Sequence, residues 1–274
     1  SSLFTQKLLE YFSGSFIFYF ELLCMAASFS IRCSIVSAFI LLLQTTLYGQ
    51  GSAGSAAVFE SRSVIDMPTA GVLTPSYFAL ATRVSPKGDF TADMAVAPFN
   101  NMNVRLFATG KNLISNESVQ FNLPTLQAQF RFIDETRSFP ALAVGITSKT
   151  NGYFNQDFLF NQSVGGWISA SKNFKGLIGA IALHGGAFVS AHSFGGYAGF
   201  EQSIGRSIAV VGEASLASKN NSASNDKIYG LCNASFRWSV VRGITMELIA
   251  HDIFSTVNSR GIGRAFGIEF IRAW

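Results

Sequence analysis

Charged residues are scarce in this sequence of 274 residues, where aspartate, glutamate, lysine and arginine together make up 13%. That is about half the share of an average soluble domain. The 20 basic and 16 acidic residues are scattered along the chain and form no basic stripe. Because proteins that bind nucleic acid usually gather their positive charge on one face, we expect no nucleic-acid partner.

Cysteine is nearly absent, and its spacing excludes both a disulfide framework and a zinc site. Two of the three cysteines, Cys24 and Cys33, lie in a region that we expect to be removed from the mature protein. The remaining Cys232 is expected to be a small apolar strand residue rather than a reactive thiol.

Groups that would carry catalysis are also missing from the sequence. No G-x-S-x-G element is present, and His184, His192 and His251 do not have the spacing of metal ligands. In a strand, sequence neighbours such as His251 and Asp252 point to opposite faces, so they do not form a catalytic pair. We therefore predict no catalytic residue, no metal, no cofactor and no enzymatic activity.

What the sequence does contain is a high share of aromatic residues, 14%, including 27 phenylalanines, spread through short alternating segments. The last of these segments is the clearest. Phe266, Ile268, Phe270 and Trp274 fall on one face of an extended chain, while Gly267, Glu269 and Ile271 fall on the other. An apolar face opposite a face of small and polar residues is typical of a strand with lipid outside and a polar lumen inside.

The same alternation recurs from Tyr77 to the end of the chain, for example in residues 126–132. It predicts an all-β fold, an antiparallel up-and-down transmembrane β-barrel of about twelve strands, with ten or fourteen as the alternatives. The sheet must close because hydrocarbon leaves no partner for an unpaired backbone group. Residues 172–175 are predicted to be a turn, and residues 218–226 the most polar loop. The rival fold is a soluble β-sandwich behind an N-terminal anchor.

Four regions are predicted along the chain. Residues 1–24 are interpreted as a non-native upstream leader and residues 25–50 as a signal peptide, with Arg32 before the apolar run 35–43. Residues 51–75 form a linker and entry segment, and residues 76–274 form the barrel. The alternative for the N-terminal region is an inner-membrane anchor formed by residues 15–43.

The entry segment carries a resemblance to a known family. It contains Asp66, Pro68, Thr69 and Ala70, followed by the alternating segment from Tyr77. This arrangement resembles the Pro-Thr-Ala element that precedes the first strand in the YjbH-like group of bacterial outer-membrane proteins, which are associated with exopolysaccharide production. The resemblance implies a bacterial outer-membrane barrel with a role connected to cell-surface polysaccharide.

The alternation also predicts which charged side chains face the lumen. They form either a conduit that selects solutes by charge or, as we favour, a network that fills a closed barrel. The predicted lumen-facing residues are Arg83, Asp93, Arg105, Arg131, Glu201, Glu213, Arg237, Glu247 and Glu269.

Aromatic residues near the predicted strand ends are expected to form a girdle at the membrane interface. They are Tyr77, Trp167, Trp238 and Trp274.

The sequence thus predicts a protein of the bacterial outer membrane, with the lipid bilayer as its surroundings. The C-terminal strand, which ends in an aromatic residue, would engage the barrel-assembly machinery. The expected role is structural or transport, linked by resemblance to polysaccharide export. One alternative is a non-conducting barrel that anchors or joins a larger envelope complex. A third hypothesis is an outer-membrane lipid hydrolase or acyltransferase.

Overall fold

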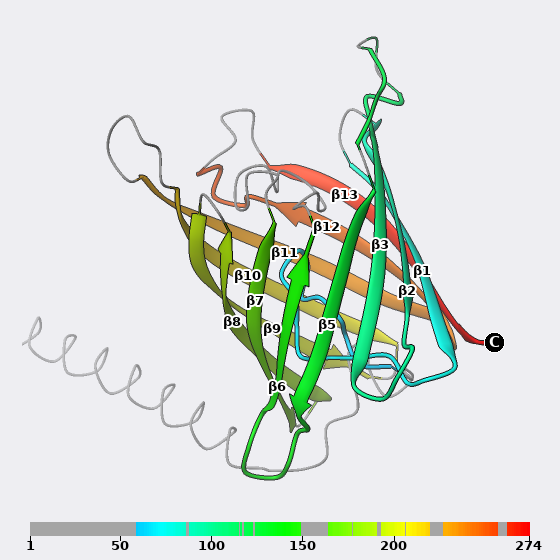
Figure 1. Ribbon diagram of the computed structural model, residues 1–274, viewed down its shortest axis with the longest axis vertical. Coiled ribbons are helices and arrows are strands. Elements are labelled where there is room, and N and C mark those ends of the chain that lie inside the picture. The colour runs from blue at the N-terminus through cyan, green and yellow to red at the C-terminus, as the bar shows by residue number, and fades with distance from the viewer. Residues whose placement is uncertain are drawn as a thin grey trace, which may run out of the picture. The chain divides into compact units, whose positions relative to one another are not determined.

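A computed structural model of the protein describes residues 59–85, 88–114, 116, 118–122, 124–148, 164–176, 178–190, 193–205, 207–219, 227–256 and 262–274. The predicted leader 1–24, the signal peptide 25–50 and His192 lie outside these residues. In the described part, the chain forms a closed antiparallel barrel of twelve strands (Figure 1). This confirms the predicted fold class.

The strands follow the chain around the barrel, and a short thirteenth strand, β4, extends one edge of β3. Their bounds are β1 (Tyr77–Val84), β2 (Phe90–Val96), β3 (Met102–Lys111), β4 (Gln120–Phe121), β5 (Thr125–Ile133), β6 (Ala141–Thr147), β7 (Gly165–Lys175), β8 (Ala180–Ser190), β9 (Ser193–Ile204), β10 (Ile208–Lys219), β11 (Lys227–Val241), β12 (Ile244–His251) and β13 (Gly263–Ala273).

The barrel closes between its first and last strands. β1 pairs with β13 from Tyr77 opposite Ala273 to Val84 opposite Phe266. The remaining strands pair with the strands that precede and follow them in the chain. The one exception among these pairs is β3 with β5, which skips the two-residue β4. Both ends of the barrel wall, Tyr77 and Ala273, therefore lie at the same rim.

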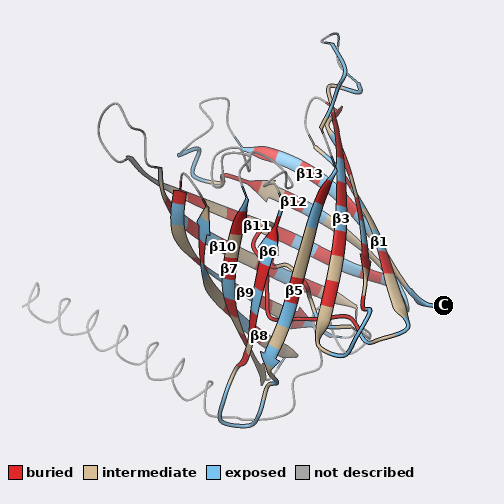
Figure 2. Ribbon diagram, viewed as in Figure 1, coloured by how far each residue is buried: buried red, intermediate tan, exposed pale blue. Residues whose placement is uncertain are grey.

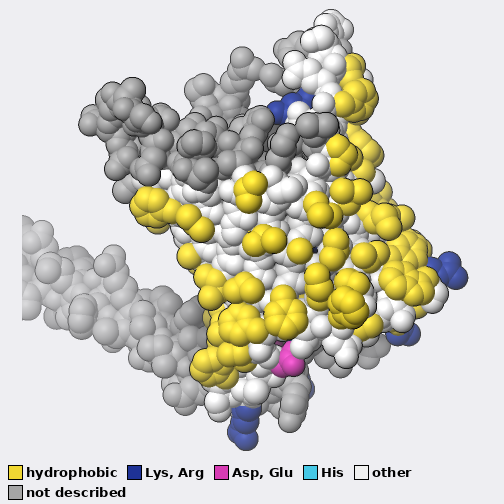
Figure 3. Space-filling view, in the orientation of Figure 1, with side chains coloured by type: hydrophobic (Ala, Val, Ile, Leu, Met, Phe, Trp, Pro, Cys, Tyr) yellow, Lys and Arg dark blue, Asp and Glu magenta, His cyan; other side chains and the backbone are white. Residues whose placement is uncertain are grey.

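Burial alternates along the strands, as the sequence pattern predicts (Figure 2). On β10, Leu216 is 60% exposed while the adjacent Ala217 is 2% exposed. Successive side chains of a strand point to opposite faces, so the two residues lie in two different surroundings. The outer surface carries mainly apolar side chains, and charged side chains are scarce across the strands on the face shown in Figure 3.

The two rims of the barrel differ in their connections. At one rim the chain turns within residues 97–101, 134–140, 176–179, 205–207 and 242–243, and we call this the short-turn end. At the opposite rim the connections include the longer spans 112–124, 148–164 and 252–262. Among the described residues, no helix is long and apolar enough to cross a bilayer.

One predicted turn is wrong. Residues 172–175 continue strand β7 and pair with β8 as far as Lys175 opposite Ala180. The chain turns instead at residues 176–179, where Gly176 N–H donates to the Gly179 carbonyl at 2.7 Å. Polar residues marked this stretch as a turn in the sequence, but a strand of a barrel can carry polar residues near a rim. The same effect extends β10 to Lys219, inside the predicted loop 218–226.

Candidate functional site

The inside of the barrel is occupied by residues 59–75, which we call the luminal segment. The sequence predicted a linker and entry segment in residues 51–75, without placing it. In the structure the chain enters the lumen, turns and runs back before β1 begins (Figure 1). Val64 N–H donates to the Met67 carbonyl at 2.8 Å, which makes the tight turn at the tip. Behind the tip, Ser63 pairs with Pro68 in an antiparallel bridge. The segment is therefore an irregular hairpin held inside the barrel.

Glu213 on β10 holds the tip of this hairpin. One of its carboxylate oxygens accepts the backbone N–H groups of Ile65, Asp66 and Met67 at 2.9, 2.9 and 2.8 Å. Its other oxygen accepts the amide of Asn233 at 2.9 Å. Three consecutive N–H groups converge on one buried carboxyl oxygen, so the segment forms a concave site of donors that a side chain of the barrel wall fills.

A group of arginines surrounds the tip. Arg237 binds the carboxylates of Glu201 and Glu247 at 2.7 Å each and also donates to the Val64 carbonyl. Arg83 donates to the Asp66 carboxylate at 2.7 Å and to the Ile65 carbonyl at 3.1 Å. These charges are buried, so each must be paired to remain stable.

Asp66 lies at the tip between Arg83 and the imidazole of His251, whose Nδ1 is 3.2 Å from the carboxylate. Burial alone would raise the pKa of Asp66. His251 and Arg83 outweigh that effect and hold the pKa below its usual range. Asp66 is therefore a carboxylate in the folded protein.

The limb that returns toward β1 is held by neutral side chains of the wall. Gln129 donates to the carbonyls of Thr69 and Gly71 at 2.9 and 3.1 Å, and Asn103 accepts the Leu73 N–H at 2.8 Å. Ser169 donates to the Thr69 carbonyl at 3.0 Å, and Ser171 accepts the Ala70 N–H at 2.9 Å. Backbone groups that would otherwise be buried without partners are thus satisfied.

Apolar side chains of the luminal segment fill four separate patches of the wall. Met67 packs with an aromatic cluster, and Val64 with Ile65 packs against β10, β12 and β13. Leu73 lies among alanines of β1 and β2, and Ala70 contacts alanines of β6. Because many inward-facing residues of the wall are small, the lumen has room for the segment.

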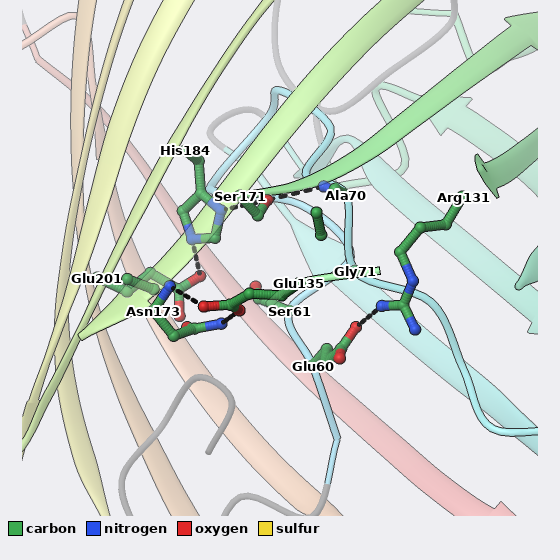
Figure 4. Close-up of a pocket in the computed structure, with 12 residues that line it drawn as sticks. Glu60, Ser61, Ala70, Gly71, Arg131, Glu135, Ser171, Asn173, His184 and Glu201 are labelled. Atoms are coloured by element: carbon green, nitrogen blue, oxygen red, sulfur yellow. Dashed lines mark hydrogen bonds and ion pairs between the residues drawn. The ribbon is translucent and has the colours of Figure 1, made fainter. Parts of the chain in front are cut away.

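A small cavity of about 20 Å³, room for about one water molecule, lies beside the segment, and most of the residues around it are polar (Figure 4). Ser171 and His184 Nδ1 are 2.8 Å apart in its lining, and His184 Nε2 is 3.9 Å from Glu201. The arrangement of Ser171, His184 and Glu201 differs from a catalytic triad. Ser171 already accepts the Ala70 N–H, and Glu201 is bound by Arg237 rather than hydrogen-bonded to the imidazole. Ser171 instead joins the segment to β7 and, through His184, to β8.

All nine predicted lumen-facing residues lie on the inner side of the wall. Three of them pair with charged residues of the luminal segment, Arg83 with Asp66, Arg131 with Glu60 and Glu269 with Arg62. A fourth, Glu213, accepts its backbone N–H groups, and Arg237 donates to its backbone carbonyls. Asp93 pairs with Arg105 within the wall, and Glu201 and Glu247 pair with Arg237.

Two of the four predicted interface aromatics lie on the inner side instead. Trp167 is 6% exposed and packs on Met67 inside the barrel, because it shares a face with Ser169 and Ser171. Tyr77 contacts Phe59 of the luminal segment, with ring centroids 4.9 Å apart. Trp238 and Trp274 are 47% and 68% exposed on the outer surface near the short-turn end.

Sequence reasoning missed the neutral side chains that hold the segment. Asn103, Gln129, Ser169, Ser171 and Asn233 all belong to the inward-facing alternation, and that alternation is the pattern that would have identified them. Within the described residues, no group of three or more histidine, cysteine, aspartate or glutamate side chains could hold a metal ion.

Comparison with known proteins finds no family model that matches this chain and no curated protein that matches its sequence. The fold and the luminal segment therefore carry the functional argument.

Proposed function

We propose that this protein is a bacterial outer-membrane β-barrel with a structural role in the cell envelope, closed by its own luminal segment. A closed barrel with an apolar outer surface fits an outer-membrane barrel in general. The observation that carries the closed state is the binding of three backbone N–H groups of the tip by Glu213. A carboxylate committed to the segment in this way is not available to a passing solute.

The two unlike rims support the same assignment. In outer-membrane barrels the short turns face the periplasm and the longer loops face outward. Here β1 starts and β13 finishes at the short-turn end, which fits a barrel wall whose first and last strands open to the periplasm. The exposed Trp274 at the end of the last strand is the aromatic residue that the assembly machinery would meet.

Location and architecture are tested together by membrane fractionation and gel mobility. We expect the protein in the outer-membrane fraction, extracted only by detergent, with faster migration before heating than after it. A protein that stays monomeric in buffer without detergent would contradict the proposal.

The closed state is tested by conductance in planar bilayers. We expect no steady current from the native protein, because residues 59–75 fill the lumen. The double variant Glu213→Ala/Arg83→Ala removes two of the three wall side chains that bind the backbone of the tip, leaving Arg237, and should give intermittent openings. The double variant Leu248→Ala/Leu216→Ala changes only the outer surface and should remain silent. Steady currents from the native protein would show that the lumen is open.

A second candidate is a gated conduit, which by resemblance would serve export of cell-surface polysaccharide. The observation that favours it is the polar nature of many contacts between segment and wall, which water or a polar solute can replace. In that case voltage or an added polysaccharide fragment should open the native barrel reversibly. Silence of the native barrel under both conditions, with openings in the double variant, would favour the structural role.

A further inference from the structure

The wall of the barrel recognises the luminal segment largely through its backbone. Side chains of the wall bind the N–H groups of Ile65, Asp66, Met67, Ala70 and Leu73. They also bind the carbonyl groups of Ser63, Val64, Ile65, Thr69 and Gly71. Backbone contacts of this kind are how proteins bind extended peptides from other chains, with pockets for particular side chains adding selectivity.

The segment can also leave the lumen without threading. Phe59 at its start contacts Tyr77 just beyond its end, so both limbs pass through the short-turn end. Between them, Thr69 N–H donates to the Arg62 carbonyl at 3.3 Å, so the two limbs are bonded to each other as well as to the wall. Residues 59–75 could therefore leave and re-enter through one rim, without threading through the wall.

We infer that the lumen is a binding site for an extended polypeptide hairpin, which accepts such a segment from another chain when its own is released. This inference rests on the proposed closed barrel. The ligand class is a peptide that enters from the short-turn side with a small-residue returning limb. In this barrel the site is filled from within the same chain.

Close contacts define which peptides would fit. A Cβ on Gly71 would lie 2.1 Å from the Ser61 carbonyl oxygen, so the residue at that position must be glycine. On the wall, a Cβ on Gly199 would lie 2.6 Å from Val64, so this inward glycine leaves room for the tip. Met67 enters the cluster of Trp167, Phe188, Tyr197 and Ala217.

The test uses the full chain with a site-specific protease sequence inserted after the exposed Thr74. The protein is folded in detergent micelles and then cleaved, so that the segment stays in place only through its non-covalent contacts. A fluorescent synthetic peptide with the sequence of residues 59–75 is added, with and without urea below the unfolding midpoint. We expect its anisotropy to rise and to saturate at one peptide per barrel.

Matched variants show whether the binding uses the contacts described above. Gln129→Ala should weaken peptide binding by roughly tenfold, since it removes two hydrogen bonds to the segment. Gln127→Ala lies two positions away on the same strand and should leave binding unchanged. A peptide carrying Gly71→Val should bind at least tenfold more weakly than the native peptide.

Two outcomes would overturn the inference. One is no uptake of the native peptide over a day, with or without urea. The other is equal uptake of a scrambled peptide of the same composition. Failure of the proposed closed barrel would be recognised separately, as steady conductance of the uncleaved native protein.

Discussion

Arg83 on β1 donates to the carboxylate of Asp66 at 2.7 Å, which joins the first strand of the barrel to the tip of the segment inside it. The side chains of both residues are at most 6% exposed. The contact links positions 17 residues apart in sequence, across the full return limb of the hairpin. This contact therefore ties the tip of the luminal segment directly to the strand that follows it in the chain.

The Arg83–Asp66 pair should show strong energetic coupling. We expect Arg83→Met or Asp66→Asn alone to lower the free energy of unfolding by about 3–5 kcal/mol, because each removes the nearest opposite charge from a buried ionised group. The double variant should lose clearly less than the sum of the two. Urea unfolding in micelles, followed by tryptophan fluorescence, measures this cycle. Additive effects would mean that the two residues are not paired in solution.

Glu213→Gln should destabilise the protein by about 3 kcal/mol, because glutamine has an NH₂ group in place of one carboxyl oxygen. That group would face either the three N–H donors of the tip or the donating amide of Asn233. Asp134→Asn is the control, since the Asp134 side chain is 63% exposed and its ion pair with Arg131 is worth little. The shift in urea midpoint distinguishes the two. Equal shifts would argue that the tip does not rest on Glu213.

Gly71→Ala should loosen the returning limb, because the added Cβ would collide with the Ser61 carbonyl oxygen. We expect faster cleavage by an added protease near the exposed Thr74. Gly185→Ala is the matched control, since the nearest atom to its added Cβ, the Tyr197 carbonyl oxygen, is at 3.5 Å. A cleavage rate that is the same in both variants would contradict the packing of the two limbs.

The alternation of side chains was sufficient to predict the barrel and the inner position of residues such as Glu201 and Glu213. It depends only on the backbone geometry of a strand and on the contrast between two surroundings. The alternation also places Trp167 correctly, on the inner face of β7 together with Ser169. The prediction for Trp167 was wrong because it relied on nearness to a strand end instead of on that face.

The luminal segment could not be predicted in this way. Residues 59–75 form no regular strand, so they have no period to detect, and Pro68 and Gly71 are typical of a linker. Their position depends on long-range contacts, such as that between Met67 and Glu213, 146 residues apart.

Single-tryptophan variants should separate the inner and outer aromatic residues. In vesicles with brominated lipid, we expect strong quenching of Trp238 and Trp274, which are exposed on the outer surface, and little quenching of Trp167. The reason is that bromine quenches only on close approach, and the barrel wall lies between Trp167 and the lipid. Quenching of Trp167 as strong as that of Trp238 would place its ring outside the barrel.

Leu248 tests the nature of the outer surface. It lies midway along β12, is 59% exposed, and has Phe236 and Phe266 as its neighbours on adjacent strands. If this surface faces lipid, Leu248→Arg should reduce the free energy of folding into vesicles by about 2–4 kcal/mol, the cost of arginine near the bilayer midplane. Leu248→Ala should cost less, because it removes apolar contact without introducing charge. In a protein dissolved in water, an exposed leucine could be replaced by arginine at almost no cost. A Leu248→Arg variant as stable as the native protein would therefore argue against a membrane-spanning barrel.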